Sequence, residues 1–154
     1  MRMGRVLALV SGALVFFIVV LGLAVFLTRD EDNLQADNLL AEAITQRIAE
    51  APDNGNVLDL REVATFPWQR VLVVQPGTSR AQISERLGSE WTGIDTVDGG
   101  DLFLFLDGGG DVVRFADYRG SNTFEGFERP FEEIARDDAT FSVRDQVIRP
   151  GPDT

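Results

Sequence analysis

Five aspartates that stand among glycines are the first residues of this sequence whose type and spacing could do chemistry. Clustered carboxylates can bind calcium through their oxygen atoms, and Asp107 with Asp111 would be the best pair for such a site. The spacing matches no EF-hand loop, and aspartate and glycine are also the residues that tight turns use. We therefore favour turn chemistry, assign no metal site and keep a weak calcium-binding module as an alternative. The five are Asp95, Asp98, Asp101, Asp107 and Asp111.

Four glutamates near the C-terminus could supply the acid and the base of a hydrolase that uses only carboxylates and acts on cell-wall or sugar substrates. They are Glu125, Glu128, Glu132 and Glu133. Spacing along the chain does not bring two carboxyls together in space, and scattered glutamates are expected in so acidic a sequence. We favour a solvated surface, assign no catalytic residue and keep the hydrolase as an alternative.

The composition excludes several classes of site. The 154 residues contain no histidine and no cysteine, which removes the usual general base, thiolate nucleophiles, disulfides and the common zinc ligands. We therefore predict no cofactor. Lysine and arginine total 14, all of them arginine, against 25 acidic residues, so the net charge is −11. Such a surface repels nucleic acid, which is excluded as a partner.

An uncharged apolar segment, residues 6–27, lies near the N-terminus. At about 1.5 Å per residue, a helix of this length can cross a hydrocarbon core of about 30 Å. The alternative is a cleaved secretory signal, for which Gly22 and Ala24 provide small residues at a suitable spacing, although the apolar part of a signal is usually only about 7–15 residues long. We favour a retained transmembrane helix.

The charges that flank this segment predict its orientation. Arg2 and Arg5 precede it, whereas all of the acidic residues follow it, beginning with Asp30. Positive flanks stay in the cytoplasm. We therefore expect residues 1–5 in the cytoplasm of a bacterium, residues 6–27 in its plasma (inner) membrane, and residues 28–154 as an acidic domain that is periplasmic or extracellular.

Apolar periodicity and turn residues predict the helices of the exported domain. Leu40, Ile44 and Ile48 lie four residues apart and mark the buried face of one helix, which ends before Pro52. A capping-box pattern at Ser79 and a glycine at the other end indicate a second helix that closes at position 88.

Three segments predict strands. Residues 68–74 are rich in β-branched residues, and LFLFL at 102–106 suits a strand covered on both faces, with DGGGD as the turn to a return strand at 112–119. A last strand begins at Ala139, and the tail RPGPDT is expected to fray. The predicted fold is α+β, with an antiparallel sheet of about three to five strands and two helices.

Five aromatic residues are candidates for binding a partner. They could form an exposed apolar patch, although burial in the core is the commoner fate of such side chains. The five are Trp91, Tyr118, Phe124, Phe127 and Phe131.

The segment FPWQRVLVVQPGTSRAQISERLG resembles a pattern in small bacterial envelope proteins and lipoproteins of uncharacterised function. There a tryptophan opens a strand, a turn with proline follows, and a short helix ends in Leu-Gly; the matching positions here are Trp68, Pro76 and Leu87 with Gly88. PGTSRAQISERLG is also similar to the glycine-led helix of the small lipoprotein in the outer-membrane assembly machine. This chain lacks the cysteine that accepts lipid, and Gln69 stands where an acidic residue is common.

The resemblance implies an α+β envelope module that binds or assembles and catalyses no reaction. Together with the predicted anchor it leads us to expect a non-enzymatic, membrane-anchored accessory protein of the envelope. Its partner would be another protein of the envelope.

Overall fold

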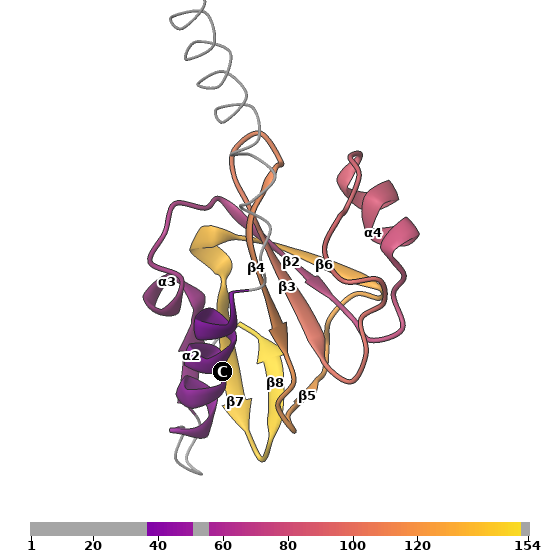
Figure 1. Cartoon of the computed structure of the whole chain (residues 1–154). Helices are drawn as coiled ribbons and strands as arrows, with labels where there is room; N and C mark the ends of the chain where they lie inside the picture. Colours follow the sequence, from indigo (N-terminus) through magenta and orange to yellow (C-terminus); the bar gives the residue numbers. More distant parts are fainter. Residues whose placement is uncertain (1–36, 51–55, 152–154) are drawn as a thin grey trace, which may run out of the picture. The chain divides into compact units, whose positions relative to one another are not determined.

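The structure is a computed structural model and describes residues 37–50 and 56–151, which form two four-stranded sheets and three α-helices (Figure 1). The α+β prediction is confirmed for these residues, whereas the prediction of a single sheet with two helices is wrong. The helices are α2 (Asn38–Ala49), α3 (Leu60–Val63) and α4 (Arg80–Leu87), and a 3-10 helix covers Arg136–Asp138. The strands are β1 (Asn56–Asp59), β2 (Arg70–Val74), β3 (Asp101–Leu106), β4 (Val112–Tyr118), β5 (Thr123–Phe124), β6 (Phe131–Ala135), β7 (Thr140–Arg144) and β8 (Val147–Pro150).

The first sheet has the strand order β4-β3-β2-β6, and each pair of neighbouring strands in it is antiparallel. All six residues of β3 are buried because both faces of this sheet are covered. Phe103 and Phe105 face the larger hydrophobic cluster, whereas Leu102 and Leu104 face a smaller one under α4. The prediction of a strand covered on both faces, with a hairpin at its end, is therefore confirmed.

The second sheet, with the order β1-β7-β8-β5, corrects the prediction of one last strand after Ala139. The chain folds back between β7 and β8 at Asp145 and Gln146, whose φ angles of 51° and 64° are those of a tight hairpin turn. The predicted frayed tail is also wrong up to Gly151, because the Gly151 N–H donates to the Thr140 carbonyl at 2.8 Å. Residues 152–154 lie outside the described ranges.

Both helices that the sequence predicts within residues 28–154 are confirmed. In α2 the Asp37 side chain accepts from the Leu40 N–H, and Leu40, Ile44 and Ile48 are buried. In α4 both hydrogen bonds of the capping box between Ser79 and Gln82 are present, and Gly88 ends the helix in the left-handed conformation. Helix α3 was not predicted, since it is a single turn that Asp59 caps.

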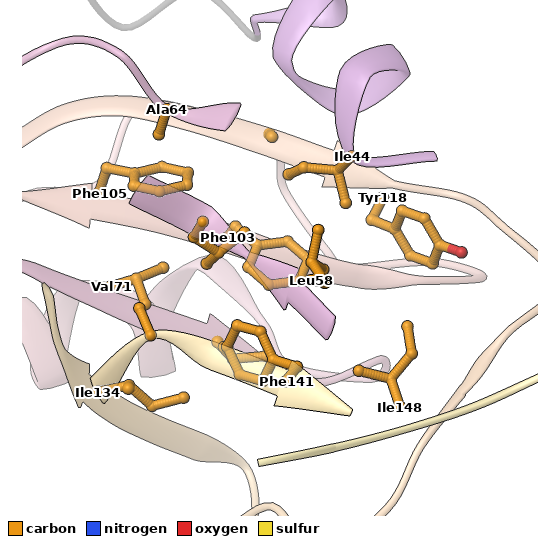
Figure 2. Close-up of a cluster of buried hydrophobic side chains, with 14 of the residues drawn as sticks. Ile44, Leu58, Ala64, Val71, Phe103, Phe105, Tyr118, Ile134, Phe141 and Ile148 are labelled. Atoms are coloured by element: carbon orange, nitrogen blue, oxygen red, sulfur yellow. The ribbon is translucent and has the colours of Figure 1, made fainter. Parts of the chain in front are cut away.

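The larger hydrophobic cluster lies between the two sheets and under α2 (Figure 2). Phe103, at the centre of the first sheet, is fully buried, and Figure 2 shows it beside Leu58 from β1 and above Phe141 from β7. The ring of Tyr118 closes one side of this cluster, with its hydroxyl directed away from the cluster. The cluster thus joins residues from strands that lie far apart in the sequence.

The predicted transmembrane helix at residues 6–27, with its orientation, lies outside the described residues. No helix within 37–50 or 56–151 has the length and apolar character needed to cross a bilayer.

Candidate ligand pocket

The structure gives Asp107 and Asp111 a role in the turn between β3 and β4. One carboxylate oxygen of Asp107 accepts from the N–H groups of Gly109, Gly110 and Asp111 at 2.8, 2.9 and 3.0 Å. These hydrogen bonds hold the pKa of Asp107 below its ordinary value, and the one from the Asp111 N–H has the largest effect. Within the described ranges, no three carboxylates are grouped closely enough to hold a metal ion. The hydrogen bonds of Asp107 therefore support the turn interpretation for this residue.

The four glutamates do not all line one site, although Glu132 and Glu133 both line an open pocket together with Asp137 and Asp138. Glu133 on β6 forms ion pairs with Arg70 at 2.7 Å and with Arg86 at 2.7 Å, so it links the sheet to α4. Glu125 pairs with Arg149 at 2.6 Å, and the Glu132 carboxylate accepts from the Glu128 N–H. Three of the four carboxylates thus hold neighbouring segments together at the surface.

Four of the five candidate aromatic residues are in the interior and do not form an exposed apolar patch. Trp91, Tyr118, Phe124 and Phe127 are each at most 8% exposed, and Phe131 is half-buried against the cluster under α4. Their rings pack against one another and against other core residues. The ring of Phe127 lies 5.4 Å from the ring of Phe124 and 5.8 Å from that of Phe141. The commoner fate, core packing, is the one observed.

One aspartate of the five differs from the rest. Asp101 opens β3 on the same face as Phe103 and is only 7% exposed. Among the described residues, its carboxylate accepts no hydrogen bond. Burial raises its pKa to about 6, and the charge of Arg129 opposes that rise only in part. Asp101 is therefore a nearly buried residue whose carboxylate oxygens, although not sealed from solvent, lack the hydrogen-bond partner that such groups ordinarily have within the described residues.

The Asp101 side chain lines a cavity of about 270 Å³ at one end of the first sheet. Strand register explains how the walls meet there: Asp101 lies opposite Tyr118 at the end of β4, and the end of β2 lies opposite the starts of β3 and β6. The lining thus comes from segments spread over more than fifty residues. Its polar members are Gln75, Asp101, Asn122, Thr123 and Arg129.

Two glycines allow the walls of this cavity to close around Tyr118. A Cβ atom at Gly100 would lie 1.8 Å from the Tyr118 carbonyl oxygen, and one at Gly120 would lie 1.9 Å from its hydroxyl. Only glycine permits both approaches. The Tyr118 hydroxyl, held in this way, donates to the Asn122 carbonyl oxygen at 2.8 Å, which orients the amide at the cavity wall.

The two charged residues that line the cavity, Asp101 and Arg129, do not form an ion pair with each other. Arg129 is exposed at the cavity rim and, within the described residues, forms no ion pair. Gln75 is 5% exposed, and its main chain is fixed by hydrogen bonds to Pro130 and Thr78. The cavity therefore offers a carboxylate, two amides and, at its rim, a guanidinium.

A site of this kind is suited to holding a ligand by charge and hydrogen bonds. Acid–base hydrolysis by carboxylates uses two such groups about 5–10 Å apart, whereas Asp101 is the one carboxylate among the described residues that line this cavity. The sequence pattern places Asp101 with the turn aspartates and does not indicate a role for Gln75, Asn122 or Arg129. The usable signal was the pair Gly99-Gly100 directly before an aspartate that shares a strand face with Phe103 and Phe105.

Comparison of the chain with protein-family models, with curated proteins and with solved structures gives no match.

Proposed function

We propose that this chain is a non-enzymatic accessory protein of the bacterial envelope, anchored in the plasma membrane by residues 6–27, whose exported domain binds another envelope protein. The observation that carries the binding role is the Asp101 pocket. A carboxylate that is nearly buried and without a partner destabilises the folded domain unless a ligand supplies the missing interaction. Among the described residues, the pocket is lined by one carboxylate, whereas a hydrolase of this type uses two, which favours binding over catalysis.

The size of the pocket also fits this role. About 270 Å³ accommodates one side chain or a chain terminus, and lies just below the usual range of cavities that bind small molecules. The resemblance to envelope lipoproteins, although it covers only the segment 66–88, points to the same class of function. Anchoring, export and binding then belong together, because a tether keeps the domain near a partner in the same membrane.

The absence of cysteine and lysine from the chain allows a sharp test. A single cysteine is introduced at Thr123, which is exposed at the pocket, or at Gly108 in the β3–β4 turn, where a Cβ atom meets nothing closer than 3.9 Å. Both variants of the full chain are expressed in intact cells. A small membrane-impermeant maleimide should label both cysteines, because the domain is exported. A maleimide–succinimidyl ester crosslinker should then join the Thr123→Cys variant to lysines of a partner, giving one discrete adduct.

The Gly108→Cys variant is the matched control, since it lies at the opposite end of β3 from the pocket. It should give no such adduct. Labelling that requires cell lysis would contradict export. Equal adducts from both positions, or none from position 123, would contradict binding at the pocket.

A further inference from the structure

The charges in the pocket identify the chemistry of its ligand. Asp101, a residue that is more than nine-tenths buried, supplies a carboxylate, and Asn122 and Gln75 also line the pocket. The strongest complement to a desolvated carboxylate is a cation that also donates hydrogen bonds. The acidic surface of the domain favours the approach of cations as well.

The geometry distinguishes among cations. A calcium ion takes six to eight oxygen ligands, commonly with several carboxylates, whereas this cavity has one among the described residues and carries a guanidinium at its rim. A primary ammonium needs fewer partners, because it has three donors on a compact head at the end of a narrow stem. One donor can meet Asp101 and the others can meet the amide oxygens.

Arg129 sets a second requirement. Its exposed guanidinium at the rim has five donors and no ionic partner among the described residues. It can hydrogen-bond a carbonyl or carboxylate that lies a few atoms away from the ammonium on the same ligand. A ligand with an ammonium at one end and an acceptor at the other therefore satisfies both charges of the pocket at once.

We propose that the Asp101 pocket binds a primary ammonium group that carries a carbonyl or carboxylate acceptor a few atoms away. This inference rests on the proposed binding function and specifies its chemistry. The ammonium belongs either to a lysine side chain of the partner protein or to a free amino acid. A second copy of this chain does not provide a lysine side chain, since the sequence contains none.

The test uses the purified full chain in mild detergent and three probes, followed by NMR or calorimetry. Nα-acetyl-lysine N-methylamide represents a lysine in a protein, glycine represents a free amino acid, and Nα-acetyl-norleucine N-methylamide is the uncharged control. Saturable binding of the lysine probe alone would identify a protein source, and saturable binding of glycine alone a free amino acid. Norleucine should not bind.

Two aspartate variants remove the same charge from different places. Asp101→Asn should weaken binding by at least about tenfold, because it removes a charged hydrogen-bond partner. Asp98→Asn should leave binding unchanged, since that side chain is exposed and outside the pocket. If Asp101→Asn fails to fold, the amide NMR shifts of Gly100 and Asn122 in the unaltered chain decide: they should be among the largest on adding the bound probe.

Several results would overturn the inference. These are no saturable binding of either charged probe, equal binding of norleucine, equal weakening by both variants, or NMR shifts elsewhere on the domain. A partner adduct at position 123 combined with any of them would leave the proposed binding function standing and remove only the ammonium. If neither the adduct at position 123 nor saturable binding of a charged probe were observed, both the proposed binding function and the ammonium inference would be contradicted.

Discussion

Replacing Phe103 with alanine is expected to lower the free energy of unfolding of the domain by about 3–5 kcal/mol. Phe103 is 0% exposed, and its ring lies 5.7 Å from that of Phe124 and 6.5 Å from that of Tyr118 in edge-on contacts. Its removal leaves a cavity between two sheets that are each held by other strands, so the walls cannot collapse to fill it. Urea unfolding, followed by the fluorescence of Trp68 and Trp91, measures the loss.

The matched control for this prediction is Leu39→Ala. Leu39 lies in α2 with 77% of its surface exposed, so its truncation should change the free energy of unfolding by less than about 0.5 kcal/mol. If Phe103→Ala and Leu39→Ala were equally mild, the packing of β3 between the two sheets would be wrong.

Replacing Asp101 with asparagine should make the domain more stable at pH 8, by about 1–2 kcal/mol once allowance is made for solvent that reaches the carboxyl through the pocket. Burial raises the pKa of this carboxyl in the folded state to about 6, against its ordinary value of 3.8. The folded state therefore holds its proton more tightly than the unfolded state does. Stability contributed by the protonated form is fully present below pH 3.8 and is lost as the pH rises to about 6.

The pH dependence distinguishes this cause from a general effect of the substitution. The advantage of Asp101→Asn should be near zero at about pH 3.5, grow between about pH 4 and 6, and stay constant above that range. Asp98→Asn, which removes the same charge from an exposed position, should show no such growth. A variant at position 101 that is less stable than the natural chain at pH 8 would indicate that the carboxylate has a stabilising partner.

Local signals in the sequence were enough to predict several elements. The capping box at Ser79, the spacing of Leu40, Ile44 and Ile48, and the glycine-rich turn after β3 each depend on residues within one turn or one hairpin. Such signals do not require knowledge of the rest of the chain, because the interactions that produce them close within a few residues. The structure confirms all three.

The second sheet could not be predicted in this way. Strand β5 has two residues and pairs in parallel with β8, and β1 pairs with β7, which lies more than eighty residues later. Neither β1 nor β5 is long enough to show the alternation of apolar and polar residues that marks a strand in the sequence. The β7–β8 turn was missed because Asp145 and Gln146 take positive φ without a glycine.

For a related reason, the sequence left open whether the aromatic residues are exposed or buried. Gly126 and Pro130 interrupt the segment that holds Phe124 and Phe127, so it resembled a loop. Its burial depends on β5 pairing with β8, which brings the rings onto Phe141. A short strand buried by distant contacts leaves little trace in local composition.

The candidate pocket was equally hidden in the sequence. Its walls come from the ends of β2 and β4, the start of β3, β5 and Arg129, and they meet only through the register of the first sheet. Aspartate beside two glycines also looks like a turn. What separates Asp101 from the turn aspartates is that it lies on the strand face of Phe103, and this becomes visible only once the strand is placed.

The central claim is that Asp101 is nearly buried, that its carboxylate has no hydrogen-bond partner in the part of the chain that the structure describes, and that it is open to a ligand. Its titration in the full chain, followed by the NMR shift of the aspartate side-chain carbon, tests this claim most directly. Within the described residues, the charged and titratable groups around it are Arg129 before β6 and Tyr118 on β4, whose own pKa burial raises above its ordinary value. The account predicts one aspartate, absent from the spectrum of Asp101→Asn, with a midpoint near pH 6. A midpoint for Asp101 at or below about pH 4 would contradict it.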